Sequence, residues 1–152
     1  MAQFKVQIKG LNKLNTAFKK SPKIVFTNLS MAVKTSINII RPMMVRNAPV
    51  DTSKLRQNIY ARTSGLKGEV GPNLKITPYA IYVHEGTRPH IIRAVNKKVL
   101  ADTKRGIIFG PVVHHPGTRP NPFVKRTAEE AVEPVNQIFR RAADKIADDL
   151  TK

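Results

Sequence analysis

The spacing of apolar residues along the chain predicts two long amphipathic helices. Over residues 22–47, apolar side chains recur at steps of three and four, which is the period of one helix face. The same period returns over residues 122–150. Ser21-Pro22 and Asn121-Pro122 each place a capping side chain before a proline, a pattern typical of a helix start. Pro49 predicts the end of the first helix, because proline disfavours helix at the residue before it.

Prolines inside these helical stretches predict irregularities. Pro42 predicts a kink or a break in the first helix, and Pro134 interrupts the apolar stripe of the second. We expect that second stripe to pack on a sheet within the same chain. Residues 3–9 alternate between polar and apolar, which predicts a half-buried strand and not a signal peptide, since no apolar run follows.

The segment between the helices begins with short elements. Asp51-Thr52-Ser53 is expected to cap a short turn that carries Leu55 inward. Residues 58–63 predict a strand, and Gly65 and Gly68 suit the turn of a hairpin whose return strand follows.

A short helix and a long excursion come next. Thr77-Pro78 predicts a helix start, and Gly86 is placed to close that helix in a left-handed conformation. Residues 88–121 are rich in proline, glycine, histidine and basic residues, and we expect them to form a β-hairpin with residues 104–106 near its tip. An excursion of this length in a compact domain is usually functional.

The tetrapeptide Gly-Thr-Arg-Pro occurs twice, at residues 86–89 and 117–120, and we expect the two copies to form the feet of the excursion. The order of elements predicts an α+β fold, in which a small antiparallel β-sheet packs against the two long helices and the hairpin protrudes. The length predicts a single domain over residues 1–152, with the C-terminal helix over residues 122–150.

The charge is concentrated outside the last helix. The chain has 27 basic and 10 acidic residues, a net charge of +17. Residues 1–122 hold 21 basic and 4 acidic residues, whereas residues 123–152 hold 6 of each. Seven basic residues of the excursion are predicted to face a partner, namely Arg88, Arg93, Lys97, Lys98, Lys104, Arg105 and Arg119. A basic body can bind nucleic acid or an acidic protein, so the charge alone leaves both open.

Four short phrases stand in a fixed order: Ala-Pro-Val-Asp-Thr at 48–52, Leu-Arg-x-x-Ile at 55–59, Tyr-Ala-Ile-Tyr-Val-His-Glu-Gly-Thr at 79–87 and His-Pro-Gly-Thr-Arg-Pro-Asn-Pro-Phe at 115–123. Their order resembles the tail-completion, or head–tail joining (neck), proteins of long-tailed bacteriophages over residues 22–150. Three residues depart from that pattern. Ser53 replaces the usual Gly and Asn58 replaces the usual Ser, and the acidic Glu85 lies directly before Gly86 and not one residue earlier. Eight residues of these phrases are predicted structural corners, meaning places where a helix stops, a turn tightens or a helix begins. They are Pro49, Asp51, Thr52, Gly86, Pro116, Gly117, Pro120 and Pro122.

The resemblance implies a virion structural protein that completes the tail and joins it to the head. It implies a ring of copies of the chain, with a hexamer expected, contacts with neighbouring neck or tail-tube proteins, and assembly in the host cytoplasm. The basic excursion would be the arm that reaches a neighbour.

Catalysis finds little support in the residues. The chain has no cysteine, no G-x-S-x-G or phosphate-binding loop, and no H-E-x-x-H pair, so we predict no catalytic, cofactor-binding or metal-binding residue. His90 and His114-His115 would meet if the excursion folds as a hairpin. The alternative function is a basic, non-specific DNA-binding module, although no aromatic residues interleave the basic clusters. No apolar stretch is long enough to span a membrane.

Overall fold

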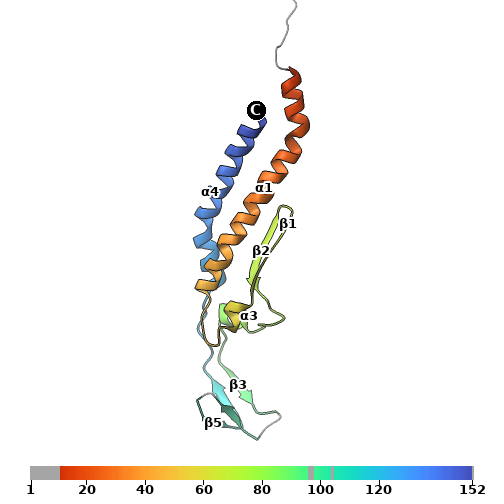
Figure 1. Ribbon diagram of the computed structural model, residues 1–152. Helices are drawn as coiled ribbons and strands as arrows, with labels where there is room; N and C mark the ends of the chain where they lie inside the picture. Colours follow the sequence, from red (N-terminus) through yellow and green to blue (C-terminus); the bar gives the residue numbers. More distant parts are fainter. Residues whose placement is uncertain (1–10, 96–97, 104, 152) are drawn as a thin grey trace, which may run out of the picture.

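The computed structural model describes residues 11–95, 98–103 and 105–151, and it has the predicted α+β fold. Figure 1 shows two long helices side by side, a hairpin on one flank and a lobe at one end. The elements are α1 (Leu11–Asn47), α2 (Lys54–Gln57), β1 (Ile59–Ser64), β2 (Lys67–Pro72), α3 (Ala80–Glu85), β3 (His90–Arg93), β4 (Leu100–Asp102), β5 (Ile107–Gly110), β6 (Val112–His115) and α4 (Phe123–Thr151).

The two long helices pack against each other as an antiparallel pair (Figure 1). Asn28 Nδ2 donates to Asp149 Oδ2 at 3.3 Å, and Asn47 Nδ2 donates to Thr127 Oγ1 at 3.1 Å. The middle of α1 therefore lies beside the end of α4, and the end of α1 beside the start of α4. The expectation that the stripe of α4 packs mainly on the sheet was wrong, because α1 is its main partner.

Both long helices run through their prolines. Helix α1 begins at Leu11 and continues through Pro22 and Pro42, and α4 continues through Pro134. The predicted helix start at Ser21-Pro22 and the break at Pro42 were therefore wrong. Pro22 and Pro42 are exposed, so the carbonyls that lose their helical partners lie on the solvent side, and packing on α4 stabilises the rest of the helix. The strand predicted over residues 3–9 lies outside the described residues.

The hairpin β1–β2 packs on α1. Its antiparallel register runs from Ile59 opposite Pro72 to Ser64 opposite Lys67, with Gly65 at a φ of +56° in the turn. Gly68 lies in β2 and not in the turn as predicted. A Cβ at Gly68 would come within 2.6 Å of the Ile37 side chain, so glycine is needed there for the close approach of β2 to α1.

The hairpin also carries an exposed cross-strand ion pair. Arg62 and Glu69 lie opposite each other, with Nη2 and Oε2 2.6 Å apart. The hydrogen bond that Arg62 donates to the Glu69 carboxylate raises the pKa of Arg62 above its ordinary value. Because both side chains are exposed, the pair favours this register more than it adds to stability.

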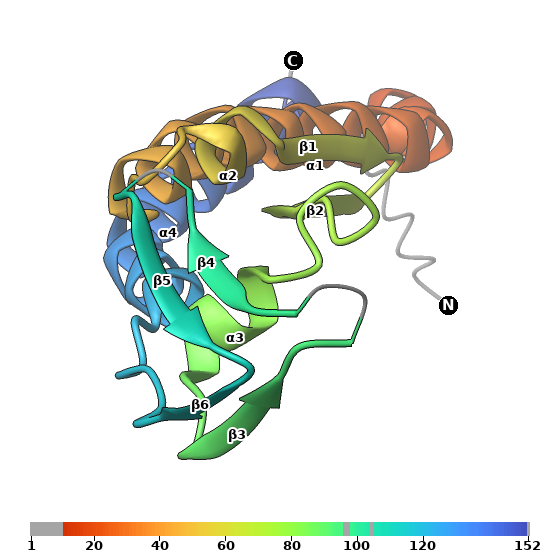
Figure 2. The ribbon, with the colours of Figure 1, turned by 90° about the horizontal axis from the view of Figure 1, so that it is seen from below.

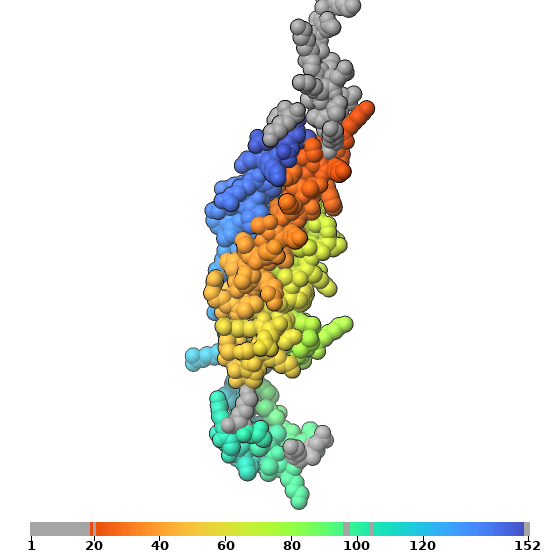
Figure 3. All heavy atoms as spheres, in the orientation of Figure 1, coloured from red at the N-terminus to blue at the C-terminus, as the bar shows by residue number. Residues whose placement is uncertain are grey.

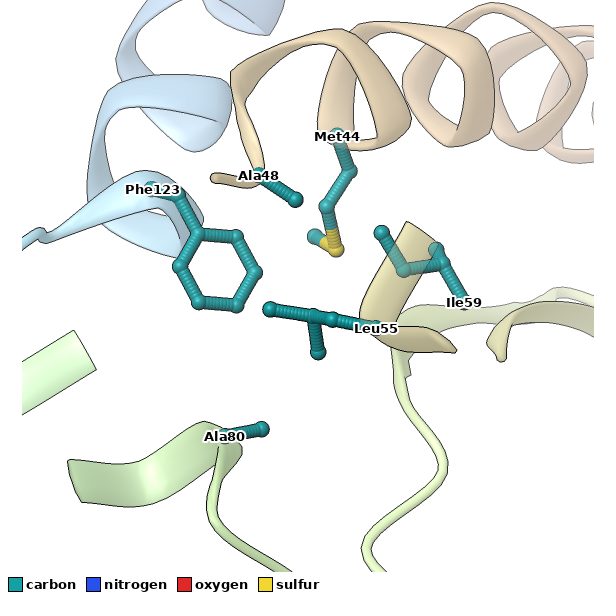
Figure 4. Packing of buried hydrophobic residues seen from close by; sticks show 6 residues of the cluster. All are labelled: Met44, Ala48, Leu55, Ile59, Ala80 and Phe123. Carbon is teal, nitrogen blue, oxygen red and sulfur yellow. The ribbon is translucent and has the colours of Figure 1, made fainter. Parts of the chain in front are cut away.

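One buried cluster joins the ends of the body elements. Figure 4 shows the six buried residues Met44, Ala48, Leu55, Ile59, Ala80 and Phe123 converging from α1, α2, β1, α3 and α4. Phe123, the first residue of α4, is 0% exposed and is the largest side chain of the cluster. The prediction that Leu55 points inward is confirmed.

The turn before α2 differs from the predicted cap. Ser53 precedes α2 at a φ of +60° and makes no side-chain capping hydrogen bond. Among the described residues it is the one non-glycine residue with a positive φ. An L-residue incurs a steric penalty there, which explains why glycine is usual at this position of the phrase.

The other two cap-and-proline starts also use their polar side chains differently. The Thr77 hydroxyl donates to Asn73 O at 2.9 Å, and α3 begins later, at Ala80. The Asn121 side-chain oxygen accepts from Arg126 Nη2 at 2.7 Å, and α4 begins at Phe123. Each of these side chains bonds a group four or five residues away and does not cap its helix, so the predicted capping role was wrong in both places.

Phe123→Ala should lower the free energy of unfolding by about 3–5 kcal/mol, because it leaves a cavity where five elements meet. Denaturant titration followed by circular dichroism measures this loss. Phe109→Ala is the matched control, since Phe109 is 50% exposed and the same truncation there should cost less than about 1 kcal/mol. Equal losses for both variants would contradict the central role of Phe123.

Ser53→Gly should raise the free energy of unfolding by about 0.5–1 kcal/mol, because glycine removes the steric cost of the positive φ. The control is Ser30→Gly in the interior of α1, which should instead lower the free energy of unfolding by about 0.5 kcal/mol, since glycine is a poor helix former. Denaturant titration measures both changes. A loss of stability in the Ser53 variant would show that the serine side chain is needed in the turn.

Candidate assembly interface

Residues 88–121, named the arm below, form a lobe beyond the body. Figure 3 shows that the molecule narrows between this lobe and the body. Figure 2 shows the strands of the lobe as two pairs. In one pair β3 is antiparallel to β6, with His90 opposite His115 and Arg93 opposite Val112. In the other, β4 is antiparallel to β5. The predicted protruding hairpin is therefore confirmed, and it is folded into two successive ladders.

The repeated tetrapeptide forms the feet of the arm, as predicted. Thr87 pairs with Thr118 in an isolated antiparallel bridge. Thr87 N donates to Thr118 O at 3.0 Å, and Thr118 N donates to Thr87 O at 3.1 Å. Thr118 N also lies 3.0 Å from Thr87 Oγ1. The second residue of each copy thus binds the second residue of the other.

The glycine of each copy lies against the backbone of the other copy. Gly86 has a φ of +75°, and a Cβ there would lie 2.5 Å from Thr118 O and 2.9 Å from Pro120 N. Gly117 has a φ of +88°, and a Cβ there would collide with Thr87 O. Both positions therefore require glycine for conformation and for space. The ψ of Gly86 is −178°, so this residue is extended and not in the left-handed helical C-cap that was predicted.

The arm exposes most of its apolar side chains. All four residues of β3 are exposed, and β5 exposes three of four. Ile108 is 72% exposed, Ile91 and Phe109 are each 50% exposed, and Val95 in the connection to β4 is 91% exposed. Exposed apolar groups gathered on one lobe are typical of a surface that a partner covers.

The predicted partner-facing cations lie on the same lobe. Arg88, Arg93, Lys98, Arg105 and Arg119 are all exposed. Arg105 Nε lies 3.8 Å from Asp102 Oδ2, across the turn at the tip. Lys97 and Lys104 lie outside the described residues. Whether these cations contact a partner stays a prediction.

The predicted corners lie where the chain changes direction. Pro49 follows the end of α1, and exposed Asp51 and Thr52 precede α2. Pro116 directly precedes the second foot, Pro120 is the last residue of that foot, and Pro122 lies directly before α4.

Sequence reasoning missed the arginines at the end of α1. Arg56 Nε donates to Ala48 O at 2.9 Å and its Nη2 to Arg46 O at 3.1 Å. Arg126 Nη2 donates to Asn47 O at 3.1 Å. Cations are favourable at the carbonyl end of a helix. The signal in the sequence was the Leu-Arg pair six residues beyond Pro49, but the carbonyls that it binds cannot be assigned without the fold.

His90 and His115 lie side by side, as expected if the excursion folds as a hairpin. Both histidines also contact the backbone of the feet. The rings of His90 and His115 stack with centroids 5.0 Å apart. His90 Nδ1 lies 2.9 Å from Arg88 O, and His115 Nδ1 accepts from Gly117 N at 3.0 Å. Within residues 11–95, 98–103 and 105–151, no three His, Cys, Asp or Glu side chains are grouped so as to hold a metal ion.

The comparison with protein families decides the class of the molecule. A family described as "Bacteriophage HK97-gp10, putative tail-component" matches residues 11–86, which is half of the 152-residue chain. The chain belongs to this HK97-gp10-like family. No curated protein and no solved structure matches the chain.

The match establishes a bacteriophage tail component, hence a structural role in the virion tail and contacts with other tail proteins. The resemblance to a tail or neck family is thereby confirmed. The matched segment spans α1 to Gly86 and stops at the first foot, so the arm and α4 lie outside it. None of the helices in the described part is long and apolar enough to cross a bilayer.

Gly86→Ala and Gly117→Ala should each destabilise the feet more than Gly106→Ala does. All three glycines have a positive φ, which costs an alanine about 1–2 kcal/mol, but a Cβ at Gly106 meets nothing within 4 Å. The added loss at the feet should appear in the free energy of unfolding and as faster proteolysis within the arm. Equal effects for all three variants would show that only φ matters, and not the contact between the feet.

Proposed function

We propose that this tail component completes the phage tail and joins it to the head, as a ring made of copies of the chain. Six copies are the expected number, neck or tail-tube proteins are the neighbours, and assembly takes place in the host cytoplasm. The observation that carries the proposal is the arm, a lobe with a fixed base whose apolar side chains are exposed. A second copy or an adjacent tail protein would cover that surface.

The shape of the arm supports assembly over catalysis. Two-stranded ladders are marginally stable by themselves, and the strands of the arm bury little against their own chain. Covering its apolar residues would contribute about 25 cal/mol for each Å² removed from water. The feet fix where the arm leaves the body, so less freedom is lost when a partner binds.

Non-specific contact with viral DNA is the second candidate, and one observation favours it. Helix α1 carries seven basic residues and no acidic residue. Such a helix could lie along phosphates inside a ring through which DNA passes. Binding of this kind weakens by orders of magnitude over a modest rise in salt, whereas assembly through apolar contacts does not.

Removal of the arm should abolish assembly and leave the body folded. In the variant, residues 91–114 are replaced by a short Gly-Ser turn between His90 and His115, which keeps both feet. Light scattering gives the mass of the variant and of the full chain, each alone and co-expressed with tail-tube subunits. We expect a discrete ring or tube-bound form for the full chain only, with equal helix content per residue of the body in both proteins.

The charge is tested separately. A variant with Arg93, Lys98 and Arg105 changed to Gln keeps the apolar surface and removes three exposed cations.

Assembly of the armless variant at full-chain strength would contradict the proposal. A full chain that stays monomeric, ignores tubes and binds DNA with a steep salt dependence would favour the second candidate.

A further inference from the structure

A groove on the body is shaped to receive an apolar side chain. It lies between α1, α4 and β2, has a volume of about 480 Å³, and is lined largely by apolar residues. Ala128 and Ala131 contribute only methyl groups to its lining, beside the larger Ile40, Met44 and Val132. Val132 lies at its edge and is 57% exposed. This site is named the α1–α4 groove below.

The arm carries a matching projection. Ile108 lies in β5 and is 72% exposed. Its partner across the ladder is Ala101, whose methyl group is too small to cover it. Side chains alternate between the faces of a strand, so Ile107 and Phe109 point to the opposite face. Ile108 is therefore an exposed branched side chain whose partner across the ladder is small.

Charge on the α4 side of the groove favours the meeting of the two surfaces, whereas α1 on its other side is basic. The arm holds seven basic residues and one acidic residue, whereas six of the ten acidic residues of the chain lie within residues 123–152. Exposed Glu129 is one helical turn before Val132 and thus beside the groove, and exposed Glu133 directly follows Val132. The acidic side of α4 is the part of this basic chain that would attract a basic arm.

We infer that Ile108 of one copy inserts into the α1–α4 groove of the next copy. The inference rests on the proposed ring and names the surfaces that form it. Within one chain the arm lies beyond the end of α1 (Figure 1), and it contributes no residue to the groove, which is lined by residues 37–44 of α1, 68–70 of β2 and 124–136 of α4. A projection and a groove on different parts of one molecule make a heterologous contact, which generates a ring if the rotation closes.

Disulfide trapping tests the contact directly, because the chain has no cysteine of its own. Ile108→Cys and Val132→Cys are made as separate proteins, mixed under assembly conditions and oxidised. We expect a covalent dimer that contains one chain of each kind, and little dimer from either protein alone. A chain with both substitutions should give a ladder that ends at the ring size. Val95→Cys replaces Ile108→Cys in the control, since Val95 is 91% exposed on the same arm.

Paired substitutions test the energetics. Ile108→Ala removes the projection and Ala128→Leu fills the groove, so each should weaken assembly by about tenfold or more in light scattering. Their controls are Val95→Ala and Ala143→Leu, which make the same changes at exposed positions outside the contact. All four positions are exposed, so far-UV circular dichroism and the unfolding midpoint should stay near those of the unchanged protein.

Three results would overturn the inference. The first is the absence of any effect specific to the contact. Either both the Ile108→Ala and Ala128→Leu variants assemble at full strength, or trapping through Val95→Cys is as efficient as trapping through Ile108→Cys. The second is loss of assembly on deletion of residues 1–10 while Ile108→Ala assembles normally, which would make the N-terminal segment the occupant. The third is an Ala128→Leu variant that forms rings and fails to bind tail-tube subunits, which would make the groove a site for another protein. In each case a ring of the unchanged chain leaves the proposed function standing; the proposed function itself fails if that chain forms no ring and binds no tubes.

Discussion

The burial of Phe123 is the contact on which the rest of the structure depends. Its ring is fully buried among residues from α1, α2, β1 and α3, and it is the first residue of α4. The chain reaches Phe123 directly from the second foot, since Pro120 packs against Gly86 and Asn121 N donates to Val83 O at 3.0 Å. One aromatic side chain thus anchors α4, the base of the arm and the end of α1 at the same place. Three backbone carbonyls at that end of α1 accept hydrogen bonds from Arg56 and Arg126.

This anchor divides the molecule into a body with a core and an arm without one. The body has a buried apolar cluster where α1, α2, β1, α3 and α4 meet, and it also exposes apolar residues such as Phe26, Met31 and Val132. The arm has ladders and a fixed base, but most of its strand residues are exposed. A protein that folds around the body and leaves the arm uncovered keeps apolar surface available for assembly. The family match covers the part of the body before the arm, and neither the arm nor α4 lies within it.

Charge divides the chain at a different place, because it separates α4 from the rest of the body and from the arm. Residues 1–122 carry the whole net charge of +17, whereas residues 123–152 are neutral overall and hold most of the carboxylates. Like charges on the bodies of neighbouring copies repel each other, so a stable ring needs contacts that offset this repulsion. An apolar side chain in a groove beside carboxylates supplies both attraction and orientation. Salt would then weaken the repulsion between bodies together with the attraction at the groove.

The sequence by itself determined the elements and the feet of the arm. The helical period marked α1 and α4, the alternation around Gly65 marked the β1–β2 hairpin, and the repeated Gly-Thr-Arg-Pro marked the segments that pair at the base of the arm. These signals are local or repeated, so they can be seen in the chain. Only the tertiary structure decided which surfaces meet. It carried α1 through Pro22 and Pro42, packed α4 on α1, placed Gly68 against Ile37 and turned Thr77 and Asn121 away from capping. Thr77 and Asn121 bond groups four and five residues away, so there one local contact replaced another. In the other cases a contact between residues far apart in the chain outweighed a local preference worth a few kcal/mol at most, and no pattern in one sequence records such a contact.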